Sequence, residues 1–110
     1  MDQKLISGTV DMMILEVAVD GPTYGYAVTQ AVLQRSEGKL ELKEGSLYPA
    51  LHRLERTKLL TSEWREVDGR RRKYYRLTPA GKKTLQARKQ DWLEFSQAVG
   101  RVLGENYGLT

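Results

Sequence analysis

The chain has 110 residues, enough for one domain of ordinary size and too few for two. Hydrophobic residues make up 40% and charged residues 29%, a balance that supports a buried core under a hydrated surface. The absence of cysteine and the presence of one histidine exclude disulfides, thiolate chemistry and histidine-rich metal sites. No stretch has the length and apolar character of a membrane span, and the first residues do not resemble an export signal, so we expect a cytoplasmic protein without a metal or cofactor.

Positive charge is concentrated in one part of the chain. The net charge is +4, but residues 64–90 hold ten basic and two acidic residues and carry +8, which leaves −4 for the rest. A field localised in this way favours a polyanionic partner, nucleic acid first and an anionic membrane surface second. A solvated charged surface is the alternative that needs no partner.

Two helices are expected before residue 38. The first is predicted by four apolar residues at helical spacing, which are Val10, Met13, Ile14 and Val17. Residues 7–9 offer capping side chains to it, and the Asp-Gly-Pro sequence at 20–22 ends it. The second helix should run from about Tyr24 to Ser36, with Thr23 as its cap and Gly38 at its end. The alternating residues 39–43 then predict a very short strand or an extended connection.

A third helix is expected from about Gly45 to Thr57. Proline cannot donate to the helical hydrogen-bond ladder, so Pro49 should lie in the first turn, and the helix should begin at Gly45 or Ser46. The apolar face consists of Leu47, Ala50, Leu51 and Leu54. The outward face consists of Ser46, Tyr48, His52, Arg53 and Arg56. A polar, partly basic surface therefore begins at the positive end of the helix dipole.

A basic β-hairpin should follow the third helix. The runs TSEWREV and RKYYRLT favour strands, and the dipeptide Asp68-Gly69 between them is typical of a tight turn. Strand alternation predicts one face with Lys73, Tyr75 and Leu77 and another with Tyr74, Arg76 and Thr78. The tip carries four basic residues in succession, Arg70, Arg71, Arg72 and Lys73. Their mutual repulsion is more easily explained by a counter-charged partner than by folding.

A long helix is expected at the end of the chain. Thr78 and Pro79 form a typical helix start, and the helical pattern continues to about Leu103, a length of about 37 Å. Such a helix exceeds what a small core can cover. Its apolar residues fall at heptad spacing, in a stripe formed by Leu85, Trp92, Phe95, Val99 and Val102. This stripe predicts a dimer interface, and residues 105–110 are expected to fray.

Three short helices followed by a basic hairpin predict a winged helix-turn-helix over residues 1–78, with a dimerisation helix over residues 79–104. The fold is therefore mainly α with a small β-hairpin. In this arrangement the third helix would enter the major groove of DNA, because a helix has about the width of that groove. The same order of elements also occurs in protein-interaction modules.

Three sequence blocks resemble the PadR family of bacterial transcriptional regulators, namely GPTYGYAVTQAV, EGSLYPALHRLERTKLL and GRRRKYYRLTPAGKKTL. Together with the last helix, the resemblance covers nearly the whole chain. It implies a homodimeric winged-helix repressor of the small subgroup, in which each protomer contributes one C-terminal helix to the dimer. In one place the chain departs from the family, because Ala27 stands where an acidic residue often follows Gly-Tyr.

The resemblance also implies functional residues. DNA contacts are expected at Ser46, Tyr48, Arg71, Arg72 and Lys73, and helical geometry and tip charge add His52, Arg53 and Arg70. A tryptophan on the dimerisation helix of some members stacks on planar aromatic effectors, and Trp92 matches its place. The alternatives are packing of Trp92 against its symmetry mate, packing of Tyr48 on the second helix, and His52 as an ordinary surface residue.

Two other classes of function stay open at this point. A winged-helix module could bind an acidic protein and contact DNA without sequence preference. An enzyme has little support, because Ser46, His52 and Glu55 on one short helix do not form a supported nucleophile and base. For a DNA-binding regulator, which is the leading interpretation, we expect double-stranded DNA, a second copy of the chain and a planar aromatic molecule as partners. We expect no catalytic residues.

Overall fold

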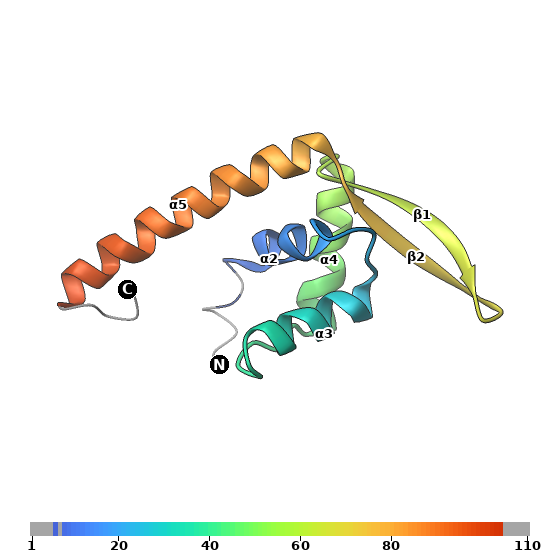
Figure 1. Cartoon of the computed structure of the whole chain (residues 1–110), viewed down its shortest axis with the longest axis horizontal. Coiled ribbons are helices and arrows are strands. Elements are labelled where there is room, and N and C mark those ends of the chain that lie inside the picture. Colours follow the sequence, from blue (N-terminus) through green and yellow to red (C-terminus); the bar gives the residue numbers. More distant parts are fainter. Residues whose placement is uncertain (1–5, 7, 105–110) are drawn as a thin grey trace.

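A computed structural model describes residue 6 and residues 8–104 of the chain. In this part the elements follow in the order α2 (Val10–Ala18), α3 (Gly25–Arg35), α4 (Glu44–Arg56), β1 (Leu60–Val67), β2 (Arg70–Leu77) and α5 (Pro79–Leu103). The short helices form a cluster from which the hairpin extends on one side and α5 on the other (Figure 1). The winged helix-turn-helix with a long last helix, predicted from the sequence, is therefore confirmed.

The core lies where α2, α3 and α4 meet the base of the hairpin and the first turns of α5. Its fully buried side chains include Ile14 and Leu15 of α2, Val28 of α3 and Leu51 of α4. Leu42, from the connection over residues 39–43, is also buried, and this connection is extended and forms no strand. Helical spacing of apolar residues places one apolar stripe of each short helix in this core. Burial of these stripes is the main source of the stability of the fold.

Of the two predicted caps before α4, that of α2 is confirmed in position only and that of α3 is wrong. Thr9 takes the N-cap position of α2, but its hydroxyl donates to the carbonyl of Ile6 at 2.9 Å and makes no capping hydrogen bond, while Ser7 lies outside the described residues. At the start of α3, Tyr24 takes the N-cap position. Thr23 instead pairs with Tyr75 of β2, through backbone N–H to carbonyl distances of 2.9 and 2.6 Å. The backbone of Thr23 thereby joins the hairpin to the helices.

Pro49 lies deeper in α4 than the sequence suggested. The helix begins at Glu44, and the carbonyl of Lys43 accepts from the N–H groups of Ser46 and Leu47 at 3.0 and 2.9 Å. Pro49 therefore occupies the second turn and leaves the carbonyl of Gly45 without its usual donor. Gly45 is exposed, so water can satisfy that carbonyl, and the proline is tolerated.

The hairpin forms as predicted. Asp68 and Gly69 have φ values of 52° and 77°, the left-handed pair that a tight two-residue turn requires. The register pairs Val67 with Arg70 at the tip and Leu60 with Leu77 at the base. Tyr75 is buried and its strand neighbours are more exposed, so the predicted alternation of faces is confirmed.

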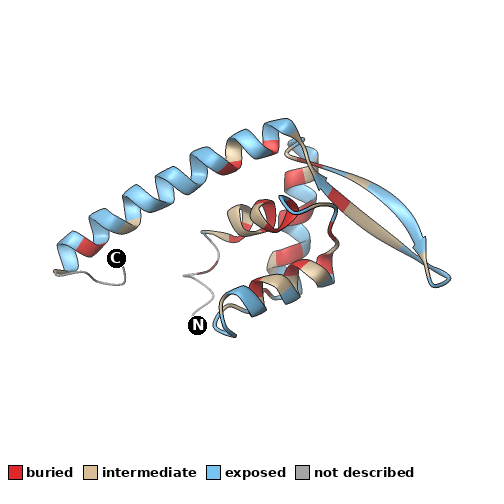
Figure 2. Cartoon of the chain, in the orientation of Figure 1, coloured by how far each residue is buried: buried red, intermediate tan, exposed pale blue. Residues whose placement is uncertain are grey.

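The start of α5 is also as predicted. Pro79 is its first residue, and the Thr78 hydroxyl accepts from the N–H of Gly81 at 2.9 Å. Beyond Leu85 most of this helix is exposed, as the pale blue ribbon in Figure 2 shows. Among the described helices none has the length and apolar composition needed to cross a membrane.

Gly81 is required where α5 meets the end of α4. A Cβ at this position would lie 2.1 Å from the carbonyl oxygen of Leu59 and 2.8 Å from Cδ1 of Leu77. We expect Gly81→Ala to lower the free energy of unfolding by about 2 kcal/mol or more, because the backbone of Leu59 must shift. Urea denaturation followed by circular dichroism measures this change.

Gly45→Ala is the matched control, because a Cβ there meets nothing within 4 Å. It should leave stability unchanged or raise it slightly, since alanine has the higher helix propensity. Equal stability of the two variants would contradict the close approach at Gly81.

Candidate nucleic-acid interface

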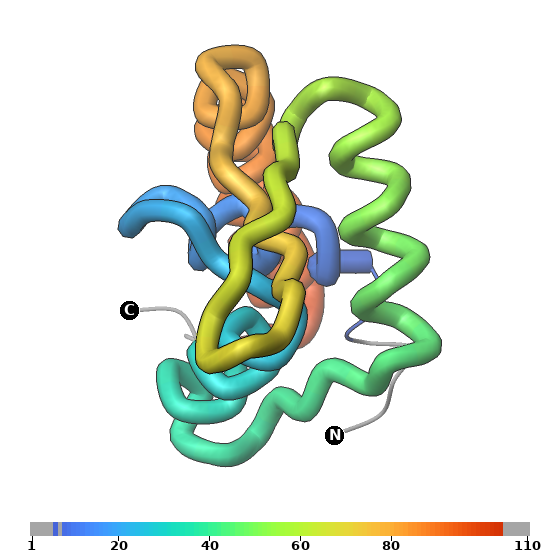
Figure 3. Tube along the Cα trace, turned by 90° about the vertical axis from the view of Figure 1, so that its right-hand side faces the viewer, coloured from blue at the N-terminus to red at the C-terminus, as the bar shows by residue number. Residues whose placement is uncertain are grey.

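The outward face of α4 and the hairpin border the same region of the molecule. Viewed from the hairpin side, the hairpin projects toward the reader with α4 beside it (Figure 3). Tyr48, Pro49, His52 and Arg56 are exposed on α4, and Ser46 is half-buried. The residues between the two strands, Asp68 and Gly69, form the most distant point of this projection.

Tyr48 packs on α3 and is also partly exposed, so the structure shows one of the two alternatives that the sequence left open. Its side chain is 41% exposed, yet its hydroxyl would lie only 2.8 Å from a Cβ on Gly25. The ring therefore packs on the first turn of α3, and Gly25 is needed to make room for it. A ring held in this way has a fixed orientation, and part of its surface remains exposed.

The strand register distributes the basic tip over two faces of the hairpin. Arg71 lies on the face that carries Trp64, with its guanidinium carbon 4.8 Å from the centre of the indole. Arg72 lies on the other face, 4.2 Å from the centre of the Tyr24 ring. Such stacking orients a guanidinium without neutralising its charge, so both arginines stay able to bind an anion.

Lys73 forms an ion pair within the protein. Its ammonium lies 2.9 Å from Oε1 of Glu55 on α4, and the hydroxyl of Ser62 on β1 donates to Oε2 of the same carboxylate. The hydrogen bond from Ser62, then that from Lys73, lowers the pKa of Glu55, and the hydrogen bond to Glu55 raises the pKa of Lys73. Burial raises the pKa of the adjacent Tyr75. We name the hairpin of β1 and β2 the wing, and Glu55, Ser62 and Lys73 the wing latch.

Arg53 also turns toward the protein. Its guanidinium makes two hydrogen bonds to Asp11 of α2, at 2.5 and 3.3 Å, and the first of these raises the pKa of Arg53. The structure places all eight predicted contact residues on exposed or half-buried surface, and six of them have no ion pair with a carboxylate of the described residues, namely Ser46, Tyr48, His52, Arg70, Arg71 and Arg72. Arg53 and Lys73 instead form ion pairs with the carboxylates of Asp11 and Glu55.

The predicted dimer stripe is only partly exposed. Trp92, Phe95, Val99 and Val102 have exposures of 42, 69, 39 and 87%. Leu85, in contrast, is 3% exposed and belongs to the core of its own chain, because the first turns of α5 pack there. The expectation that Leu85 faces a partner is therefore wrong. Heptad spacing alone also missed Leu93 and Leu103, which are 47 and 59% exposed.

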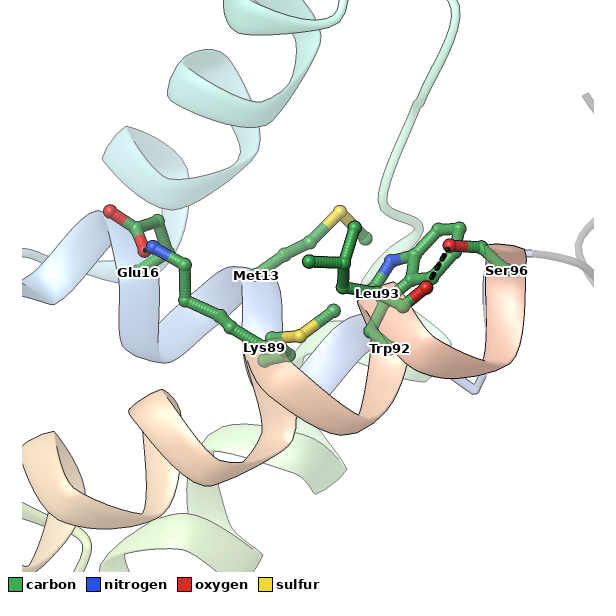
Figure 4. Close-up of a pocket in the computed structure, with 7 residues that line it drawn as sticks. Met13, Glu16, Lys89, Trp92, Leu93 and Ser96 are labelled. Carbon is green, nitrogen blue, oxygen red and sulfur yellow. Dashed lines mark hydrogen bonds and ion pairs between the residues drawn. The ribbon is translucent and has the colours of Figure 1, made fainter. Parts of the chain in front are cut away.

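A groove of about 450 Å³ separates the second half of α5 from α2. Trp92, Leu93 and Ser96 line it from α5, and Met13 and Glu16 belong to its α2 side, with Met13 directed toward Leu93 (Figure 4). A second hollow of about 980 Å³ also borders Trp92. The indole is thus accessible beside apolar side chains.

Several surface residues escaped the sequence analysis. Trp64 is 57% exposed on the wing, and Tyr26 is 65% exposed on α3. Tyr24 stacks edge-on against Tyr74, with ring centres 5.3 Å apart. The adjacency of Trp64 to the basic run was a usable signal, whereas the partner of Tyr24 depends on tertiary packing. Among the described residues, no group of acidic, histidine or cysteine side chains could hold a metal ion.

Known proteins share this sequence and architecture. Residues 14–87 match the family described as transcriptional regulator PadR-like. The chain is 41% identical over 95 residues to the transcriptional regulator Rv3488 of Mycobacterium tuberculosis, with 86% of this chain and 83% of that protein covered. It is similar to the structure of a transcriptional regulator from Clostridium thermocellum, with a TM-score of 0.86, 29% identity and coverage of 92 and 99%. It is also similar to the structure of a PadR family transcriptional regulator from Eggerthella lenta. The TM-score is 0.82, the sequence identity is 33%, and the match covers 94% of this chain and 89% of that chain.

The wing latch should make stability depend on pH. The pKa of Glu55 is lowered in the folded protein, so its stabilisation is present above the ordinary glutamate pKa of about 4.3 and is lost as the pH falls through the lower, folded value. At pH 7 we expect Glu55→Gln to lower the free energy of unfolding by about 1 kcal/mol, with a smaller difference near pH 3. Urea unfolding of both proteins at the two pH values measures it.

Glu66→Gln is the control, because Glu66 is an exposed carboxylate on the same hairpin. It should change stability little at either pH. A Glu55→Gln effect of the same size at both pH values would show that the ionised carboxylate contributes nothing.

Proposed function

Because the chain belongs to the PadR-like family of transcriptional regulators, we propose that it binds promoter DNA as a homodimer and represses transcription. In this proposal α4 enters the major groove and the wing contacts the flanking backbone or minor groove. The observation that carries it is the ion pair between Glu55 and Lys73, which fixes a basic wing beside the outward face of α4.

The two parts of this surface are suited to different tasks. Ser46, Tyr48 and His52 offer hydroxyl and imidazole groups on a helix narrow enough for the major groove, where base edges are read. Arg70 and Arg71 are exposed near the hairpin tip and can neutralise phosphates without reading sequence. Affinity should therefore come mainly from the wing, and discrimination among sequences from α4.

A second copy of the chain is the proposed cover for α5. Phe95 and Val102 are 69 and 87% exposed on a helix with little other support, and such apolar surface is typical of an interface. A two-fold dimer would present two α4 helices to half-sites about 34 Å apart, one turn of DNA. A dimer seated on a promoter would block polymerase, and such a protein would act in the cytoplasm, where the chromosome lies.

A planar aromatic effector at Trp92 completes the proposal. The groove beside Trp92, about 450 Å³, falls in the range of about 300–1,000 Å³ that small-molecule sites occupy. An indole next to apolar side chains offers a stacking surface for such a ring. A ligand there would act on DNA binding through the dimer contact, because both use the same part of α5.

The direct test is fluorescence anisotropy with the DNA upstream of the protein's own gene and a scrambled duplex, at two salt concentrations. We expect a preference of about a hundredfold or more for the upstream DNA, as sequence-reading regulators show. Sedimentation of the complex should give two protomers per duplex. Equal, salt-sensitive binding to both duplexes would instead favour a winged-helix module with a protein partner.

Two variants separate the tasks of wing and helix. Arg71→Ala should weaken binding to every duplex and lower the salt slope by about two, because each of the two protomers loses one phosphate contact. Ser46→Ala should change the preference among duplexes and leave the salt slope unaltered. Arg35→Ala, which removes an arginine paired with Asp20 at the end of α3, controls for net charge. Identical behaviour of Arg71→Ala and Ser46→Ala would refute the division.

The effector proposal is tested by tryptophan fluorescence. In a Trp64→Phe background, planar aromatic compounds should quench the emission of Trp92, since it is then the remaining tryptophan. The same compounds should lower affinity for the upstream DNA, and Trp92→Ala should remove this effect on affinity. Absence of any response across a broad panel of planar compounds would reject the effector site.

A further inference from the structure

Asp11, in the first turn of α2, binds two arginines from different elements. Its Oδ1 lies 2.5 Å from Nη2 of Arg53, and its Oδ2 lies 3.3 Å from Nε of the same residue. Oδ2 is also 3.6 Å from Nη1 of Arg88. Arg53 belongs to α4 and Arg88 to α5, so one carboxylate connects the helix proposed to read DNA with the helix proposed to form the dimer.

This arrangement differs from the other ion pairs of α2. The pair of Glu16 with Lys89, which also joins α2 to α5, is one-to-one and has side-chain exposures of 40 and 56%. The pair of Asp20, which follows α2, with Arg35 of α3 has exposures of 71 and 49%. The Asp11 side chain is only 22% exposed and serves two cations. Double hydrogen bonding of a guanidinium by a carboxylate constrains orientation as well as distance. Asp11 therefore has more influence on helix geometry than an exposed pair.

Charges around Asp11 leave the arginines dependent on it. The hollow beside Asp11 is bordered by Lys39, Arg53, Arg88 and one further carboxylate, Asp91. If the Asp11 charge were removed, Arg53 and Arg88 would face each other across a partly sheltered space with a net repulsion. The two helices would then lose a shared anchor and be pushed apart.

We propose that Asp11 is a positioning residue that fixes the orientation of α4 relative to α5, and with it the separation of the two α4 helices in a dimer. The inference rests on the proposed function, because α4 and α5 carry DNA binding and dimerisation there. Its consequence is selectivity for half-site spacing. A rigid angle permits one spacing of half-sites, whereas a loosened angle tolerates several.

A measurement of geometry without DNA tests the positioning role by itself. The chain has no cysteine, so Glu44→Cys on α4 and Gln86→Cys on α5 would carry the only two spin labels. Mixing with excess unlabelled chain isolates the distance within one protomer. Asp11→Asn should broaden and shift the distance distribution by pulsed electron resonance, and Asp20→Asn, with the same change of charge, should not. Identical distributions for wild type and Asp11→Asn would overturn the proposal.

Arg88→Gln guards against a folding defect of Asp11→Asn. This substitution leaves the contact of Asp11 with Arg53 intact and removes only the ion pair of Asp11 with α5. The distribution of distances between the two spin labels should therefore broaden, while the circular dichroism spectrum stays that of the wild type. An unchanged distribution in a folded Arg88→Gln would contradict the role assigned to the shared carboxylate.

Binding to duplexes with varied half-site spacing tests the consequence. Wild type should prefer one spacing, and Asp11→Asn should lose about tenfold of that preference, a plausible size for coupling within one charge network. Asp20→Asn should keep the wild-type preference. If wild type binds no duplex selectively, the proposed function fails, while the distance measurement still decides whether Asp11 sets the helix orientation. A broadened distribution with unaltered spacing preference would reject the link to DNA.

Discussion

The fold depends on the carbonyl oxygen of Leu59, which lies where α4, the wing and α5 meet. It accepts from the N–H of Thr78 at 3.2 Å and from the Thr78 hydroxyl at 3.1 Å. The hydroxyl in turn accepts from the N–H of Gly81. A larger residue than glycine at 81 would collide with that same carbonyl, so the first turn of α5 passes close to the backbone of Leu59. This junction orients the long helix with respect to α4.

From this junction outward, charge pairing divides the arginines and lysines into two groups. Lys73 and Arg53 are bound by carboxylates of neighbouring elements and hold the wing and α2 to α4. Arg71 and Arg72 stack on aromatic rings, which keep their charge available to a partner. The same basic composition therefore supports both internal rigidity and binding. Repulsion at the hairpin tip is reduced because successive residues of β2 point to opposite faces.

The exposed half of α5 gives the molecule its elongated form, 54 Å in its longest dimension against 22 Å in its shortest. A helix that leaves its own core after Leu85 has no covering element within the described chain for Phe95 or Val102. Four of its exposed apolar residues, Trp92, Phe95, Val99 and Val102, follow the heptad pattern, so a partner helix can cover them along one line. The ion pair of Lys89 with Glu16, at 2.7 Å, restrains the helix where it leaves the core.

The sequence by itself determined the elements that depend on local forces. Apolar residues at helical spacing set the buried stripes of the helices, Asp68-Gly69 set the hairpin turn, and Thr78-Pro79 set the start of α5. These signals act over a few residues, through backbone sterics and nearby hydrogen bonds. Most of the exposed candidate contacts, such as His52 and Arg71, could be placed in this way because the pattern of each element tells which side chains face outward.

Only the tertiary structure decided which groups, polar or apolar, find partners inside the chain. Thr23 pairs with the distant Tyr75 instead of capping α3, Arg53 binds Asp11, and Leu85 joins the core of its own chain. The outward pattern of an element does not reveal these contacts, because a long side chain can reach any oppositely charged group that folding brings near. Residues far apart in the sequence become neighbours through packing, and no local spacing records that proximity.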